Sequence, residues 1–271
     1  MKLRVDEAAS CQHALGFKLK FRCNNKRLNP RITYDALHSS ESCYIEATSV
    51  QPKMLSFQDF FTDCTGLWQS ERIYHFILKN ESERSYTEFR VSALEFAEKQ
   101  QILAVAAVGT LSGMTLNLTD DATRHRCPGF AIAFDTESET GEKVSMSLQA
   151  LFVPDAYVTR PDNLAPTPRL PIAAQVEALP QSDLIQGFYL RDEGYSETGA
   201  IAGRFTYQPT RQTLEMTTFY SRSVAVDQMR FVAPNLRMRT IVTYQRPAAD
   251  QLPTVINLMG FGVERKQPEP I

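Results

Sequence analysis

The sequence predicts an all-β protein, an antiparallel β-barrel of about 8–10 strands with one or two short helices. Three observations lead to this prediction. Many short segments are rich in β-branched and aromatic residues, turn-forming residues separate them, and a helical pattern precedes the first of them. Short strands at regular spacing form antiparallel meanders, and a meander that closes on itself encloses room for one small ligand.

The first helical pattern begins just after Met54. Ser56 and Asp59 have the spacing of a capping box, and apolar residues then recur at helical intervals until Gly66. These apolar residues are Phe57, Phe60, Phe61 and Cys64. The chain continues through Gly66-Leu67-Trp68 into a segment of strong β-formers. Because lipocalin barrels begin with a helix that turns through glycine and tryptophan into a strand, the predicted barrel is lipocalin-like (calycin).

The later strands are expected in eight further segments. They cover residues 105–118, 129–134, 144–153, 201–207, 213–220, 229–233, 236–244 and 255–264. Another helix is expected over residues 87–100, where apolar residues recur at helical intervals. Six prolines between residues 154 and 180 predict a long exposed loop, because proline cannot donate a hydrogen bond within a central strand.

The charge distribution divides the chain into an extension and a barrel. Residues 1–53 contain nine Lys/Arg and five Asp/Glu, so they carry about +4, while the whole chain carries −2. This basic extension is either a docking arm or targeting segment, or it precedes a true start at Met54. The barrel is expected over residues 54–266, and residues 267–271 form a tail.

Composition excludes several classes of protein. With 271 residues, of which 43% are hydrophobic, the chain is expected to be soluble, with no membrane span and no nucleic-acid partner. Five cysteines without CxxC spacing indicate unpaired thiols in a reducing compartment. Four scattered histidines predict no metal site. The sequence contains neither a phosphate-binding glycine loop nor a G-x-S-x-G element.

The last third of the chain carries the most specific motifs. R-D-E-G-Y begins at Arg191, A-G-R-F begins at Ala202, and F-V-A-P-N-L-R-M-R-T covers residues 231–240. With G-L-W-Q-S-E-R-I-Y-H from Gly66, this order resembles the CpcS/CpeS family of S-type phycobiliprotein bilin lyases, which ends in an E-I-R strand. The resemblance runs from about Ser56 to Arg265. It implies an enzyme that binds an open-chain bilin in its barrel and promotes thioether attachment to a phycobiliprotein cysteine.

The resemblance also implies a set of site residues. The acidic residue ten places before the first arginine of the 231–240 motif is Asp227, which would be the catalytic acid. Arg72, Arg237, Arg239 and Tyr220 would bind the bilin. Arg237 and Arg239 alternate along one strand and so share a face, and guanidinium groups bind carboxylates such as the bilin propionates in a bidentate way. The alternative is that these arginines point outward or close the barrel base beside Trp68.

The substrates and partners follow from the same resemblance. No cofactor is expected to be permanently bound, and phycocyanobilin or phycoerythrobilin is expected as a substrate. The acceptor would be a subunit of phycocyanin, allophycocyanin or phycoerythrin, and the chain would act alone, as a homodimer or with a paralogous lyase subunit. The expected location is the cytoplasm of a cyanobacterium or the plastid stroma.

Three positions depart from the family pattern. Leu111 and Arg230 stand where the family has tryptophan, and Ile241 stands where it often has serine. These changes imply altered bilin specificity, dependence on a partner, or binding without catalysis. Two other functions therefore remain open at this point. One is a carrier of bilin, another tetrapyrrole or a lipid, and the other is an assembly factor whose extension and proline-rich loop bind a protein.

Overall fold

The computed structural model describes residues 54–109, 111–164, 168–175, 183–194, 197, 199–248 and 251–268. They belong to a compact unit that spans Val50–Ile271. The predicted basic extension at residues 1–53 lies outside the described residues, as does most of the predicted tail. Cys64 and Cys127, the two cysteines that are described, are both buried free thiols.

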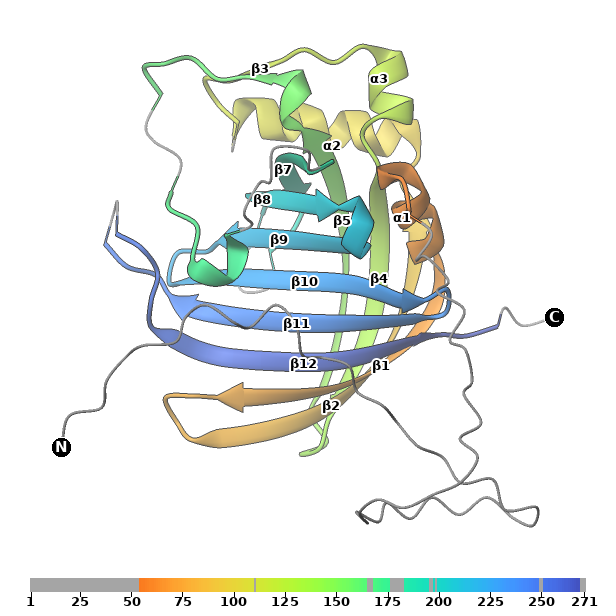
Figure 1. The fold of residues 1–271 in the computed structure, drawn as a ribbon, viewed down its shortest axis with the longest axis vertical. Helices are drawn as coiled ribbons and strands as arrows, with labels where there is room; N and C mark the ends of the chain where they lie inside the picture. The colour runs from red at the N-terminus through yellow and green to blue at the C-terminus, as the bar shows by residue number, and fades with distance from the viewer. Residues whose placement is uncertain are drawn as a thin grey trace, which may run out of the picture. The chain divides into compact units, whose positions relative to one another are not determined.

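Ten antiparallel strands close into a barrel in the order β1-β12-β11-β10-β9-β8-β7-β5-β4-β2 (Figure 1). The strands are β1 (Gly66–Phe76), β2 (Glu81–Ala93), β4 (Gly129–Ser138), β5 (Lys143–Pro154), β7 (Ile185–Arg191), β8 (Ile201–Gln208), β9 (Thr213–Phe219), β10 (Ser223–Ala233), β11 (Leu236–Gln245) and β12 (Ile256–Lys266). A separate two-stranded sheet pairs β3 (Thr115–Leu116) with β6 (Val158–Thr159). The prediction of an all-β antiparallel barrel is confirmed.

The described helices are α1 (Phe57–Cys64), α2 (Phe96–Val108) and α3 (Asp120–His125), with short 3₁₀ turns η1 (Asp155–Tyr157), η2 (Ile172–Ala174) and η3 (Pro209–Arg211). None of these helices is long and apolar enough to cross a membrane. The sequence did not predict α3. This helix follows the capping residue Thr119, whose hydroxyl accepts from the Ala122 amide.

The predicted helix over residues 87–100 is wrong in its first half. Thr87, Phe89 and Val91 are buried in β2 while Glu88 and Arg90 between them are exposed, so the period is two rather than 3.6. The helix begins at Phe96, after a capping box formed by residues 95 and 98. The predicted strand over residues 105–118 is also wrong. Helix α2 continues to Val108, and among the described residues of this range only Thr115–Leu116 pair as a strand.

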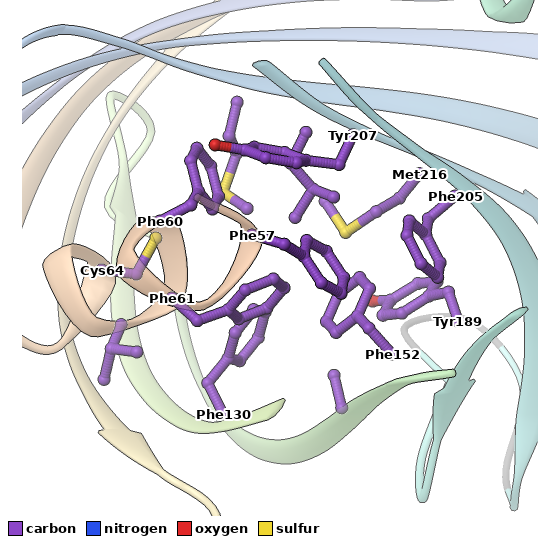
Figure 2. Packing of buried hydrophobic residues seen from close by; sticks show 14 of the residues in the cluster. Phe57, Phe60, Phe61, Cys64, Phe130, Phe152, Tyr189, Phe205, Tyr207 and Met216 are labelled. Atoms are coloured by element: carbon purple, nitrogen blue, oxygen red, sulfur yellow. The ribbon is translucent and has the colours of Figure 1, made fainter. Parts of the chain in front are cut away.

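Helix α1 closes one end of the barrel. Its Ser56 cap is confirmed, since Ser56 Oγ accepts from the Asp59 amide at 3.1 Å. The helix inserts its buried face among aromatic side chains of the strands, and Figure 2 shows Phe57, Phe60 and Phe61 at the centre of this packing. The surrounding residues include Phe130, Phe152, Tyr189, Phe205, Tyr207 and Met216. Burial of this apolar surface stabilises the closed end.

A hydrogen bond fixes the chain just before α1. The Tyr207 hydroxyl donates to the Leu55 carbonyl at 2.8 Å, and Tyr207 is fully buried. We expect Tyr207→Phe to lower the free energy of unfolding by about 0.5–1.5 kcal/mol, because the buried carbonyl loses its donor. Urea denaturation measures this change, with Tyr86→Phe on the exposed part of β2 as the control. An equal midpoint for the two variants would contradict it.

The described part of the proline-rich stretch packs on the outer wall of the barrel. Ala174 is buried and contacts a cluster that contains Val224, Val226 and Tyr244 from β10 and β11. Residues 165–167 and 176–180 lie outside the described residues. The expected exposed loop therefore contains η1, β6 and η2, and part of it covers apolar side chains that would otherwise face water.

Candidate functional site

Four neighbouring strands direct charged side chains into the barrel. Directly opposite residues of antiparallel strands share one face of the sheet. Across β1, β12 and β11, Ser70 lies opposite Glu264, which lies opposite Arg237. Two residues further along these strands, in the next row of inward side chains away from α1, Arg72 and Arg239 flank Gly262. Asp227 on β10 lies in the next layer, opposite Ile241. The structure thus brings together Asp227 and the three arginines that were predicted from the sequence.

Glu264 is the centre of this charged group. Its side chain is fully buried, and its carboxylate forms ion pairs with all three arginines. The carboxylate oxygens lie 2.7 Å from Arg237 Nη2, 2.8 Å from Arg239 Nε and 3.4 Å from Arg72 Nη2. Burial is the largest influence on its pKa and acts to raise it, but the three guanidinium groups together lower the pKa to about 2. Sequence reasoning did not select Glu264, although it is the one glutamate of the last strand, where the family pattern has E-I-R.

Arg237 has partners on every side. It is 2% exposed, its Cζ lies 4.1 Å from the Trp68 ring centroid, and its Nη1 donates to Cys64 Sγ at 3.1 Å. Its Nε and Nη2 both bind Glu264. This arrangement matches the alternative of an arginine that closes the barrel base beside Trp68. The contacts favour a role for Arg237 in holding Glu264 and α1 in place, and direct binding of bilin stays a prediction.

Arg239 links Glu264 to Asp227. Its Nη1 lies 2.6 Å from Asp227 Oδ2, and the two side chains are 10% and 20% exposed. The other carboxylate oxygen, Asp227 Oδ1, is buried and has no hydrogen-bond partner among the described residues. Burial raises the pKa of Asp227, and Arg239 opposes that rise without cancelling it. Asp227 is therefore a carboxyl group on the inner wall that retains its proton more readily than an exposed aspartate.

Arg72 is the most accessible of the three arginines. Its side chain is 17% exposed, and its Nε donates to Ser70 Oγ at 3.0 Å. Along β1 the inward side chains change from fully buried at Trp68 and Ser70 to partly exposed at Arg72 and Tyr74. An inward side chain can keep exposed surface only where solvent enters the barrel, so the end opposite α1 is open.

Tyr220 lies in a different group of residues. It follows β9, is buried, and its hydroxyl accepts from Arg191 Nη1 at 3.2 Å. Arg191 is also buried, with 2% of its surface exposed. It points inward from the end of β7, opposite Ala150 of β5. The predicted role of Tyr220 in bilin binding stays a prediction. Arg191 was not selected, although it opens the R-D-E-G-Y motif.

The structure places the three departures from the family pattern in different surroundings. Leu111 was expected in a strand, but it lies in the turn after α2. There it is fully buried against the outer side of β5 and β7. Arg230 points outward from β10 and is exposed. Ile241 lies on the inner wall opposite Asp227. Of these three positions, Ile241 is therefore the one that can contact a ligand inside the barrel.

Two clefts lie outside the barrel interior. One, of about 160 Å³, is bounded by α2 and the ends of β7 and β8. The other, of about 300 Å³, is bounded by α1, α2 and α3 and includes Lys99. Lys99 Nζ donates to the carbonyls of Thr123 and Arg124 at the end of α3, so its charge stabilises a helix terminus. The arginines around Glu264 line neither cleft.

Fold and site together define a lipocalin-like barrel, closed by a helix at one end and carrying a buried cationic group that faces the other. The chain belongs to the CpeS family: the model of the CpeS-like protein matches residues 56–162 and 173–267. This confirms the family that the sequence motifs indicated. The two matched segments leave out residues 163–172, which lie within the proline-rich stretch.

Curated relatives support the same assignment. The protein named chromophore lyase CpcS/CpeS 1 from Synechococcus sp. (strain JA-3-3Ab) is 35% identical over 213 residues, which cover 78% of this chain and 96% of that protein. Chromophore lyase CpcS/CpeS 2 from Synechocystis sp. (strain ATCC 27184 / PCC 6803 / Kazusa) is 25% identical over 67% of this chain and 77% of its own. Over nearly the whole described barrel, the chain is thus similar to proteins that are named as lyases.

A solved structure shares the fold. The S-type phycobiliprotein lyase CPES from Guillardia theta superimposes with a TM-score of 0.51 at 16% identity, over 80% of this chain and 95% of that chain. At this identity the likeness concerns the fold alone. It agrees with the closed barrel described above.

Proposed function

We propose that this chain is a phycobiliprotein chromophore lyase, which binds an open-chain bilin in the open half of its barrel and promotes its attachment to a cysteine of a phycobiliprotein subunit. Family membership and the names of the relatives support the class of reaction. The observation that carries the proposal is the pairing of Asp227 with Arg239 on the inner wall, with Asp227 Oδ1 buried and without a hydrogen-bond partner among the described residues.

The charge of the interior suits a bilin. Three arginines face two carboxylates, so the group keeps a net positive charge even when both Glu264 and Asp227 are ionised. A bilin has an apolar conjugated body and two propionates. Arg72 and Arg239, which are partly exposed, are the arginines that can reach a propionate, while Glu264 keeps their guanidinium groups oriented.

The chemistry requires a proton at the tetrapyrrole. The acceptor's cysteine thiol adds across a ring A double bond: a carbon–sulfur bond forms, the π bond breaks, and the thiol's proton is balanced by one delivered to the conjugated system. No oxidant or reductant is needed. Asp227, held beside Arg239 and with a raised pKa, can donate that proton as a general acid.

Spectroscopy followed by a transfer assay tests the proposal. The full chain is mixed with phycocyanobilin, apo-phycobiliprotein is added, and the acceptor is denatured in acid. A shifted absorption spectrum followed by bilin that stays on the denatured acceptor is the expected result. A shifted spectrum without transfer would instead support a bilin carrier or a subunit that needs a paralogue, and no shift would overturn bilin binding.

Removal of the Arg72 side chain is expected to weaken bilin binding. Arg72→Ala should raise the Kd for phycocyanobilin by about 10- to 100-fold, because a charge-assisted hydrogen bond of about 1.5–3 kcal/mol is lost. Absorption titration measures the Kd. Arg84→Ala, which removes an exposed arginine from the outer face of β2, is the control and should bind as the wild type does. Equal affinities for all three proteins would count against Arg72 as an anchor.

A further inference from the structure

The open end of the barrel carries an exposed apolar surface that folding does not explain. At this end, which lies opposite α1, strands β1, β4, β7, β9 and β11 end and strands β2, β5, β8, β10 and β12 begin (Figure 1). Large apolar side chains are exposed there: Leu78 is 67% exposed, Ile77 47% and Val255 46%. We call Ile77, Leu78 and Val255 the rim patch.

The rim patch is built on ordered turns. In the β1–β2 turn, the Lys79 amide donates to the Phe76 carbonyl at 3.1 Å, and Asn80 adopts the left-handed conformation with φ 55°. The Ile77 amide donates to the Asn257 carbonyl at 2.9 Å, which holds this turn beside the start of β12 and thus near Val255. Turn tips normally carry small polar residues. Two large apolar residues in succession, held outward by such a turn, are suited to contact a partner.

The topology decides which partner fits. A thioether to a protein requires that the acceptor's sulfur reaches the bilin. Helix α1 and its aromatic rings fill the barrel at one end (Figure 2), so the acceptor must approach from the other. An acceptor in that position covers the connections that bear the rim patch.

We infer that the rim patch is the docking surface for the phycobiliprotein subunit that accepts the bilin. This inference rests on the proposed function and adds to it the surface on which the acceptor lies. A few residues near the centre of an interface contribute most of its affinity, and a charge that is buried there without a partner is costly. A charge placed in the rim patch is therefore expected to weaken the complex.

Steady-state transfer kinetics with the full chain test the inference. Leu78→Asp, and the double variant Ile77→Ser with Leu78→Ser, should raise the KM for apo-phycobiliprotein by about tenfold at an unchanged kcat. Their absorption titration with phycocyanobilin should match that of the wild type, because the patch lies outside the arginine group. Met238→Asp is the matched control. Met238 is an exposed apolar residue, 48% exposed, on the outer wall of β11, and this variant should keep the wild-type KM.

The outcomes separate the inference from the function on which it rests. If the wild type transfers bilin and the rim variants have its KM, the docking surface is wrong and the function stands. If the wild type neither transfers bilin nor binds the apo-subunit, both are wrong. Weaker binding of free bilin by the rim variants would assign the patch to the bilin site instead. A change from dimer to monomer in light scattering would assign it to contact with a second copy, and either result overturns the inference.

Discussion

Glu264→Gln is expected to lower the free energy of unfolding by about 3–5 kcal/mol, because removal of one partner from a buried ionic group leaves uncompensated charge inside the protein. Three arginines would then face each other across the barrel base with one partly exposed carboxylate, Asp227, beside them. Urea denaturation at neutral pH measures the change. Glu71→Gln alters an exposed carboxylate on β1 and should stay within about 0.5 kcal/mol of the wild type.

The same carboxylate predicts a pH dependence of stability. The pKa of Glu264 is lowered from 4.5 to about 2 in the folded protein. A carboxyl group with a lowered pKa in the folded state stabilises the fold above its unfolded pKa, and this stabilisation is lost as the pH falls towards the folded value. The wild type should therefore lose stability between pH 4.5 and pH 2 more steeply than Glu264→Gln. Parallel curves for the two proteins would show that Glu264 does not hold the arginines as described.

The sequence predicted the barrel well because its evidence is local. A capped amphipathic helix, the Gly66-Leu67-Trp68 turn and most later strands carry periodicity or turn signals within a few residues. The error over residues 87–100 has a physical cause. Strand β2 and helix α2 are separated by two residues, and their apolar positions run together into a pattern that fits a helix. The alternation at Thr87, Phe89 and Val91 was the signal that could have separated them.

The site was predicted less completely, because it depends on pairing between strands that are distant in the sequence. Alternation placed Arg237 and Arg239 on one face, and the family pattern added Arg72 and Asp227. All three arginines contact Glu264 because of the register in which β1, β12 and β11 pair. Arg72 and Glu264 are almost 200 residues apart in the sequence. Side-chain partners of this kind cannot be read from one strand alone. The family's final E-I-R strand was the one local sign of Glu264.

Asp227→Asn is expected to slow bilin transfer by about 10²- to 10⁴-fold while bilin affinity changes little, because a carboxamide keeps the shape of the side chain but cannot deliver a proton. Arg239 can still donate to the amide oxygen at the position where it now contacts Asp227 Oδ2. The measurements are the single-turnover rate of covalent attachment and the absorption titration of free bilin. Asp135→Asn, on the exposed outer face of β4, is the control and should transfer at the wild-type rate.

The pH profile distinguishes a proton donor from a residue that merely positions Arg239. Burial raises the pKa of Asp227, so its acid form persists to higher pH than that of an exposed aspartate, and its population falls as the pH rises further. The thiolate fraction of the acceptor's cysteine also rises with pH, but this rise is the same in the assays of the wild type and of the variant. The ratio of the wild-type rate to the variant rate removes that contribution.

We expect the ratio of wild-type to Asp227→Asn rates to decrease as the pH rises through the pKa of Asp227. A ratio that is large but independent of pH would mean that Asp227 acts through Arg239, and a ratio of one would exclude it from the reaction.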